Sequence, residues 1–173
     1  LMFLECATRP DIAFAINVLS RCLDKPSLAH WSLVKRVFRY LQGTQNYGIL
    51  FTGSGNFEIF SDADYASDLE TRKSTSGIVC KFGGAPVIWK SKKQQCVALS
   101  TCEAEFVSAA SAVKEGIWLS RVLSDLGIDT GVLKLFIDHQ SAIKIIKNNE
   151  LHDRSKHIVT CIRNVKLKYV TFV

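Results

Sequence analysis

The sequence predicts an α/β fold in which helices pack on a mixed β-sheet and a helical hairpin precedes the sheet. Three observations lead to this class. Consecutive strand patterns joined by turn signals predict three antiparallel strands, and a long helix pattern follows them. After that helix, a further strand pattern at residues 133–138 predicts that the sheet continues with parallel strands.

The composition is that of one globular domain, or of one domain with a fragment of another. The chain has 173 residues, of which 47% are hydrophobic and 22% charged. No run approaches the roughly 18 apolar residues of a membrane span, and the first residues lack the basic segment of a signal peptide, so neither is expected. The six cysteines include no C-x-x-C pair, which favours free thiols in apolar surroundings over disulfides or zinc.

The net charge of +6 is unevenly distributed along the chain. Residues 1–55 carry 6 basic and 3 acidic side chains, residues 56–143 carry 9 and 11, and residues 144–173 carry 7 and 2. A basic protein with an acidic middle fits a nucleic-acid binder that holds cations at its centre. An ordinary solvated basic surface explains the same totals equally well.

Residues 1–55 are predicted to form the helical hairpin. The first helix begins with Thr8 as its cap and Pro10 in its first turn, and its apolar stripe consists of Ile12, Ala15, Ile16, Leu19 and Leu23. The second helix begins at Pro26-Ser27 and ends near Gly43, and its apolar face consists of Trp31, Val34, Phe38 and Leu41. The basic residues of this second helix lie outside its apolar face, where they contact either phosphates or solvent. A short strand at 47–51 and a turn at 53–56 place the domain boundary between residues 55 and 56.

Residues 56–173 are predicted to form the sheet domain. Strands are expected at 57–62, 75–82, 85–90 and 94–99, with a polar loop at 67–74 and a tight turn at Gly83-Gly84. Ser100 and Glu103 form the capping-box pattern of a helix that runs to about Leu126 and stops at Gly127. A strand at 133–138 and a short helix at 140–148 follow. The secondary structure of the tail, residues 157–173, is left open.

Carboxylates stand at three element ends of this domain. Asp62 closes the first strand, Glu105 lies in the first turn of the long helix, and Asp138 closes the strand at 133–138. A buried carboxylate needs a partner, and three of them together predict a site for hard cations. Asp64 is a competing ligand on the first strand, but Asp62 directly follows the apolar run. Glu103 is the alternative on the helix, but the capping box assigns it to the cap; Asp68 is expected at the surface.

These residues and their order resemble the ribonuclease H region, with the end of the reverse transcriptase, of a copia-type retrotransposon Pol polyprotein. The matching segments occur in the family's order and cover nearly the whole chain. They are Thr8-Arg-Pro-Asp-Ile12, His30-Trp31, Val34-Lys-Arg36, Arg39-Tyr-Leu41, Gly43-Thr44, Ser61-Asp-Ala-Asp64, Arg72-Lys-Ser-Thr-Ser-Gly77, Trp89-Lys-Ser-Lys-Lys-Gln94, Ala98-Leu-Ser100, Glu103-Ala-Glu105, Asp138-His-Gln-Ser-Ala-Ile143 and Ser155-Lys-His-Ile158.

The resemblance implies a function and a set of roles. Asp62, Glu105 and Asp138 would be the catalytic metal ligands, with Mg²⁺ (Mn²⁺ possible) in a two-metal centre that hydrolyses the RNA strand of an RNA–DNA hybrid. Residues 1–55 would be the end of the reverse transcriptase or its connection, and the rest of the polyprotein, including integrase, would be the partner. The expected location is a virus-like particle in the cytoplasm, or the nucleus, with no membrane. The nucleic-acid contacts would come from Arg72, Lys73, Lys90, Lys92, Lys93, Gln140, Ser141, Lys156 and His157.

The carboxyl-terminal part departs from the family pattern. The family continues Lys156-His-Ile158 with an acidic residue, where this chain has Val159, and a later histidine position holds Arg163. A fourth metal-side ligand is therefore missing unless Asp153 or His157 substitutes, and the carboxyl terminus is atypical or truncated. The alternative function is accordingly a catalytically decayed ribonuclease H-like fragment that only binds nucleic acid. An integrase, whose glutamate comes last, does not fit the order of the carboxylates.

Overall fold

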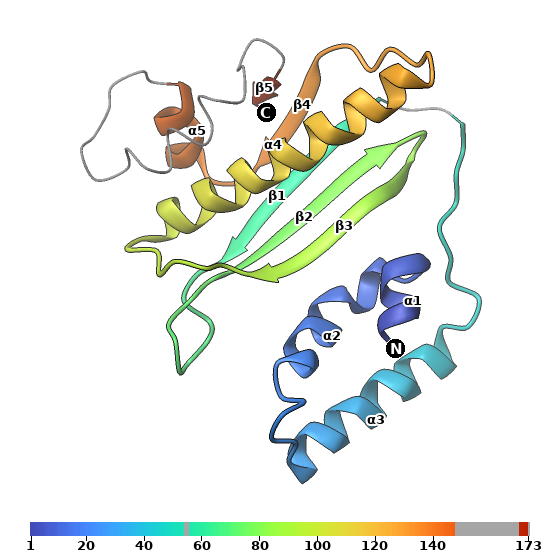
Figure 1. Ribbon diagram of the computed structural model, residues 1–173, viewed down its shortest axis with the longest axis vertical. Coiled ribbons are helices and arrows are strands. Elements are labelled where there is room, and N and C mark those ends of the chain that lie inside the picture. Colours follow the sequence, from blue (N-terminus) through green and yellow to red (C-terminus); the bar gives the residue numbers. More distant parts are fainter. Residues whose placement is uncertain (54–55, 148–169, 173) are drawn as a thin grey trace. The chain divides into compact units, whose positions relative to one another are not determined.

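The computed structural model describes residues 1–53, 56–147 and 170–172, and the chain divides into two compact units (Figure 1). The first unit comprises residues 1–50 and the second residues 51–173. The described architecture combines helices with a mixed sheet, as the sequence predicts. No described helix combines the length and the hydrophobicity needed to cross a bilayer.

The first unit is helical. It contains α1 (Met2–Ala7), a 3₁₀ turn (Pro10–Ile12), α2 (Ala13–Ser20) and α3 (Leu28–Gly43). The predicted cap at Thr8 is wrong, because Thr8 ends α1, a helix that the sequence did not predict. The predicted strand at 47–51 is also wrong, since no neighbouring strand pairs with this segment among the described residues. Ser27 does cap α3, with His30 as its reciprocal partner.

A buried arginine holds the start of this unit to the end of α3. Arg9 is 6% exposed, and its guanidinium donates to the Asp11 carboxylate at 2.7 Å and to the Thr44 Oγ1 at 2.6 Å. The Arg9 guanidinium lies over the rings of Tyr40 and Tyr47. The fork of donors satisfies Asp11 and also Thr44, which is 35 residues from Arg9 in sequence, and a lysine ammonium could not do this with the same geometry.

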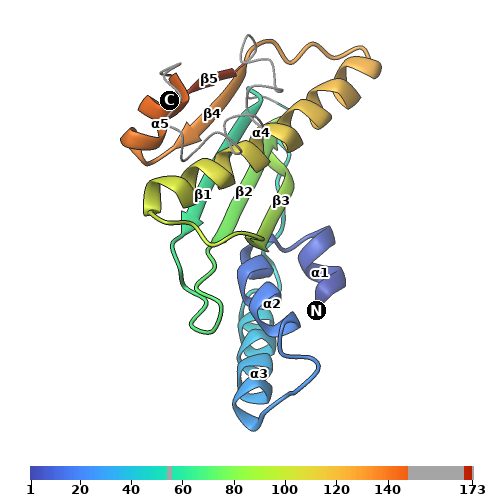
Figure 2. The ribbon, with the colours of Figure 1, turned by 60° about the vertical axis from the view of Figure 1, so that its left-hand side comes forward.

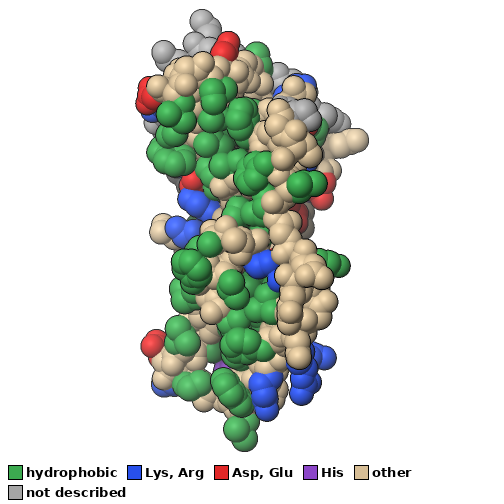
Figure 3. Space-filling model, turned by 90° about the vertical axis from the view of Figure 1, so that its right-hand side faces the viewer, with side chains coloured by type: hydrophobic (Ala, Val, Ile, Leu, Met, Phe, Trp, Pro, Cys, Tyr) green, Lys and Arg blue, Asp and Glu red, His purple; other side chains and the backbone are tan. Residues whose placement is uncertain are grey.

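The core of the helical unit is small and leaves apolar side chains at its surface. Ile12, Ile16 and Val37 are buried, with Leu19 and Leu41 packed against them. Two residues of the predicted apolar face of α3 are instead half exposed, Trp31 at 57% and Phe38 at 53%. The space-filling view shows such hydrophobic side chains on the surface of the molecule (Figure 3).

The second unit is a five-stranded mixed sheet in the order β3-β2-β1-β4-β5. Its strands are β1 (Glu58–Asp64), β2 (Thr75–Phe82), β3 (Ala85–Lys93), β4 (Leu133–Ile137) and β5 (Val170–Phe172). The first three pair antiparallel, whereas β4 pairs parallel with β1 and β5 parallel with β4. Gly83 and Gly84 both have positive φ angles, as the predicted tight turn requires. The predicted strand at 94–99 is wrong, because β3 runs on to Lys93 and the chain then leaves the sheet.

One long helix, α4 (Thr101–Asp125), crosses a face of the sheet (Figures 1 and 2). Small residues let it approach closely: Ala104, Ala109 and Ala112 are fully buried on the side that packs on the strands. The remaining core side chains, which include Ile59, Val113 and Leu135, fill the space between helix and sheet. The shorter α5 (Gln140–Lys147) follows β4. The predicted helices of this unit are thus confirmed, and β5 is an addition to the predicted strands.

The cysteines are free thiols where the structure describes them. Cys80 is fully buried in the core, and burial raises the pKa of its thiol to about 12. The apolar surroundings expected for the others are only partly found, since Cys6 and Cys96 are exposed. Cys161 lies outside the described residues.

Substitution of Gly116 by alanine is expected to destabilise the second unit. A Cβ at this position of α4 would overlap Cδ1 of Ile59 and lie 3.1 Å from its Cγ1, so this fully buried side chain would have to shift within the core. Overpacking of this kind costs about 1–3 kcal/mol of unfolding free energy, and it exceeds the gain in helix propensity. Chemical denaturation of the Gly116→Ala variant measures the loss.

The matched control is Gly43→Ala at the last residue of α3, where an added Cβ meets nothing within 4 Å. That variant is expected to be neutral or slightly stabilised. Equal stability of the two variants would contradict close packing of α4 on β1.

Candidate metal centre

Parallel pairing places two of the carboxylates at neighbouring strand ends. Ser61 of β1 pairs with Ile137 of β4, so the next residue on each strand is an aspartate, Asp62 and Asp138. Residues that end parallel strands meet at one edge of the sheet, where ligands gather. Both side chains are exposed, which leaves them accessible from solvent.

The first turn of α4 adds the third carboxylate. Ser100 caps the helix by accepting from the backbone N–H of Glu103 at 3.2 Å, while the Glu103 carboxylate accepts from the Leu99 N–H at 2.7 Å. Glu103 is therefore occupied by the cap, as predicted from the sequence. Glu105, two residues further on, is 5% exposed and faces the end of β1.

Two backbone contacts fix Glu105 relative to Asp62. The N–H of Ala63 donates to Glu105 Oε1 at 3.0 Å and also to Asp62 Oδ1 at 2.9 Å. One turn along α4, Ser108 is fully buried and its hydroxyl donates to the carbonyl oxygen of Asp62 at 2.7 Å. The sequence analysis did not identify Ser108, although its spacing of three residues from Glu105 places both on one helix face.

The three carboxylates lie close enough to share a cation. One oxygen of each residue, Asp62, Glu105 and Asp138, lies within 4.8 Å of the others. No fourth carboxylate, histidine or cysteine joins this group within the described residues. Asp64, the alternative ligand on β1, is exposed and lies outside the group. The expected acidic position at Val159, and its possible substitutes Asp153 and His157, lie outside the described residues.

The electrostatics of the cluster fit a cation. Burial, followed by the negative charges of Asp62 and Asp138, raises the pKa of Glu105 to about 7, although the Ala63 N–H opposes this shift. Its Oε2 is buried without a hydrogen-bond partner among the described residues. A divalent cation would satisfy that oxygen and neutralise the repulsion, and an all-carboxylate donor set suits Mg²⁺ or Mn²⁺ better than zinc.

Asp68, expected at the surface, is instead a structural residue of the loop after β1. Its carboxylate accepts from Lys93 Nζ at 2.5 Å and from the Thr71 hydroxyl at 2.7 Å, and these bonds lower its pKa. Its side chain is only 17% exposed. The sequence could not reveal this contact, because Lys93 is 25 residues away on another strand.

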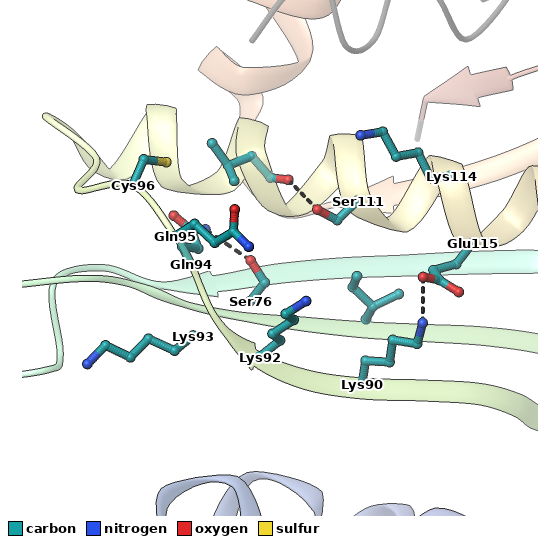
Figure 4. A pocket seen from close by; sticks show the side chains of 12 residues that line it. Ser76, Lys90, Lys92, Lys93, Gln94, Gln95, Cys96, Ser111, Lys114 and Glu115 are labelled. Carbon is teal, nitrogen blue, oxygen red and sulfur yellow. Dashed lines mark hydrogen bonds and ion pairs between the residues drawn. The ribbon is translucent and has the colours of Figure 1, made fainter. Parts of the chain in front are cut away.

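The residues predicted to bind nucleic acid fall into three places. Arg72 and Lys73 lie in the loop after β1, where Arg72 is exposed and has a φ of 53°. Gln140 and Ser141 are exposed in the first turn of α5, directly after Asp138 and His139. The three lysines of β3, Lys90, Lys92 and Lys93, line a pocket beside α4 (Figure 4). Lys156 and His157 lie outside the described residues.

Replacing Glu105 by glutamine is expected to stabilise the metal-free protein at alkaline pH. The folded state raises the pKa of Glu105 from its ordinary value of 4.5 to about 7, so ionisation opposes folding once the pH rises through this window. At pH 8 Glu105→Gln should gain about 1–2 kcal/mol of unfolding free energy, a figure reduced for partial solvent screening. At pH 4 the Glu105 carboxyl is mostly protonated and is neutral like glutamine, so the gain in unfolding free energy should vanish.

Urea denaturation in chelator at the two pH values measures this difference. Asp64→Asn, which changes a neighbouring exposed carboxylate, is the control and should show no such pH-dependent gain. A Glu105→Gln variant that is less stable than the unsubstituted protein at pH 8 would contradict the proposed repulsion.

Comparison with known proteins relates the chain to transposon polyproteins. It is 45% identical over 159 residues to the retrovirus-related Pol polyprotein from transposon TNT 1-94 of Nicotiana tabacum, a match that covers 91% of this chain and 12% of that protein. It is 48% identical over 122 residues to secreted RxLR effector protein 161 of Plasmopara viticola, covering 69% of this chain and 86% of that protein. The chain thus spans about an eighth of the polyprotein's length. No protein-family model matches the chain.

Solved structures identify the fold of the second unit. The LC11-RNase H1 isolated from compost matches with a TM-score of 0.53 at 13% identity, over 69% of this chain and 84% of that protein. The structure of LC11-RNase H1 in complex with an RNA/DNA hybrid matches with a TM-score of 0.52 at 11% identity, over 68% and 83% of the two chains. At these identities the likeness establishes the fold alone. The predicted ribonuclease H-like sheet is confirmed.

Proposed function

Because the chain belongs to the retrovirus-related Pol polyproteins of copia-type transposons, we propose that its second unit is a ribonuclease H that hydrolyses the RNA strand of RNA–DNA hybrids. One observation above all supports this function. Asp62, Glu105 and Asp138 come from three separate elements of a ribonuclease H-like fold and lie within 4.8 Å of one another at the end of the sheet. Nothing in the packing of the core requires three carboxylates to be so close.

Each carboxylate has a distinct part in the proposed reaction. Asp62 and Asp138, both exposed, would hold cations at the open side of the site, and buried Glu105 would hold its oxygen toward them through the Ala63 N–H. Two divalent cations, Mg²⁺ or Mn²⁺, would supply activation of water and neutralisation of charge on the leaving oxygen. Ser108 keeps the end of β1 in place by its bond to the Asp62 carbonyl oxygen.

The substrate and the partners follow from the same relationship. A structural neighbour was solved in complex with an RNA/DNA hybrid, and the transposon relatives are polyproteins. We propose that the hybrid is the substrate of this chain too, and that reverse transcriptase and integrase segments of one polyprotein are its partners. The helical unit, residues 1–50, would be the end of the reverse transcriptase.

Cleavage of a labelled RNA–DNA hybrid tests the proposed activity. The intact chain is expected to cut only the RNA strand when Mg²⁺ is present and to stop cutting in chelator. Asp62→Asn removes a ligand charge and should lower the rate at least about a hundredfold, because the developing charge of the reaction loses its counter-ions. Asp64→Asn, on the same strand but outside the cluster, is the matched control and should retain activity.

Cation binding can be measured separately from cleavage. Mg²⁺ at ten times its dissociation constant should stabilise the folded chain by about 1.4 kcal/mol, visible as a rise in Tm, and Asp62→Asn should lose this rise. A folded chain that binds hybrid but neither cuts it nor gains stability from Mg²⁺ or Mn²⁺ would overturn the enzyme proposal. That result would favour the binding-only alternative.

The alternative function, a decayed fragment that only binds nucleic acid, depends on the residue at position 159. If loss of an acidic ligand there has inactivated the chain, Val159→Asp should restore Mg²⁺-dependent cutting that Asp62→Asn again abolishes. An active unsubstituted chain, by contrast, would mean that an acidic residue at position 159 is not required.

A further inference from the structure

A cationic groove lies between the edge strand β3 and the helix α4 (Figure 4). Its volume is about 520 Å³, and lysines from both elements line it: Lys90, Lys92 and Lys93 from the strand side and Lys114 from the helix. The sequence analysis identified the strand lysines but missed Lys114, because only the packing of α4 on the sheet brings it into the same groove.

Two of the four lysines have carboxylate partners and two do not. Lys90 pairs with Glu115 at 2.5 Å, and Lys93 pairs with Asp68 at 2.5 Å and points away from the groove (Figure 4). Within the described part of the chain, neither Lys92 nor Lys114 has an ion pair, and both are exposed. The groove is therefore lined by two positive charges without ion-pair partners, Lys92 on the strand and Lys114 on the helix, and such a pair favours a ligand with several negative charges.

A buried polar residue, Gln94, also lines the groove. Gln94 is 6% exposed, and its amide nitrogen donates to the Ser76 hydroxyl at 3.0 Å and to the Ala104 carbonyl oxygen at 2.9 Å. These bonds tie the end of β3 to the first turn of α4. The Gln94 Oε1 is buried without a partner among the described residues, so the wall offers an unsatisfied acceptor next to the cationic groups.

The groove begins near the carboxylate cluster. Lys92 pairs with Ser76, which pairs with Ala63, so these three residues form one row across the sheet. Strands are spaced about 4.8 Å apart, which puts the Lys92 backbone roughly 10 Å from Ala63. Lys114 lies nine residues beyond Glu105 on one helix, or about 13 Å along its axis. A duplex carries a phosphate per about 1.7 Å of axis, so one held at the carboxylates would bring further phosphates within reach.

We propose that Lys92 and Lys114 bind backbone phosphates of the nucleic-acid substrate in this groove, away from the phosphate that is cut. The inference rests on the proposed function, since it makes the groove a second contact of the same substrate. Lys90 and Lys93 have a different part: the Lys90–Glu115 pair ties β3 to α4, and the Lys93–Asp68 pair ties β3 to the loop after β1.

A competing explanation comes from sheet architecture. β3 is an edge strand, and charged side chains that point inward on edge strands prevent pairing with other molecules. That explanation accounts for lysines on β3 but not for Lys114 on α4, nor for a polar wall. It also predicts a different result on substitution, namely self-association without a change in nucleic-acid binding.

The test is the salt dependence of binding to a labelled RNA–DNA hybrid in chelator, where no cleavage occurs. The double variant Lys92→Gln with Lys114→Gln should bind roughly tenfold more weakly, and the slope of log affinity against log salt should fall by about 2. The control, Lys81→Gln with Lys134→Gln, removes the same charge from the opposite face of the sheet and should keep the unsubstituted slope.

Two outcomes would overturn the inference. The first is a Lys92→Gln, Lys114→Gln variant whose salt slope equals that of the unsubstituted chain, whether or not the variant self-associates. The second is an equal loss of affinity and slope in the control variant. The result is separable from the proposed function, because Asp62→Asn should lose cleavage and keep the slope. If the intact chain does not cut the hybrid but the salt slope of its binding depends on the two lysines, the proposed function is overturned and the groove remains a binding site for polyanions.

Cys96 provides a footprint inside the groove. Its thiol is exposed and lines the groove, whereas the exposed thiol of Cys6 belongs to the helical unit. Hybrid should slow alkylation of Cys96 several-fold, measured by mass spectrometry, and the lysine double variant should lose this protection. Protection of Cys96 that the double variant retains, or that Cys6 shares equally, would contradict binding in the groove.

Discussion

The close approach of α4 to β1 is the constraint on which the rest of the second unit depends. Alanines and Gly116 on one side of the helix remove the side-chain bulk that would hold it off the sheet, and Ile59 fills the space up to the Gly116 backbone. The same approach brings Glu105 within hydrogen-bond distance of Ala63, and Ser108 within reach of the Asp62 carbonyl oxygen. Core packing and site geometry are therefore one arrangement, and a change that lifts the helix would disturb both.

The carboxylate cluster opposes the stability that this packing provides. Two unit charges at about 4.8 Å repel by on the order of 3 kcal/mol at the effective dielectric of a partly buried site, and desolvation of Glu105 adds to this cost. The protein lowers the cost without a cation in two ways: the Ala63 N–H donates to two carboxylates, and the raised pKa lets Glu105 stay neutral below about pH 7. A bound divalent cation would remove the remaining repulsion, so binding and stability are linked at this site.

The sequence predicted those parts of the fold and site that depend on local pattern. The Gly83-Gly84 turn, the Ser100 cap, and the strand patterns that lead to Asp62 and Asp138 each have a signature within a few residues. Contacts between distant segments could not be predicted: the Lys93–Asp68 pair that closes the loop after β1, the presence of Lys114 in the groove beside β3, and the strand β5. The false strands at 47–51 and 94–99 have the right composition but pair with no strand among the described residues, and pairing rather than composition makes a strand.

The lysines of β3 can both prevent this edge strand from pairing with other molecules, here called edge protection, and bind phosphates. A lysine that points inward at a sheet edge must keep its ammonium solvated, and this requires an open space between strand and helix rather than a filled core. The groove beside Lys92 is such a space, and the Lys90–Glu115 pair narrows it without closing it. Solvation of Lys114 requires no groove, because an exposed helix position already provides it. Edge protection therefore leaves unexplained why Lys114, from another element, lines the same groove as Lys92, whereas phosphate binding accounts for both lysines.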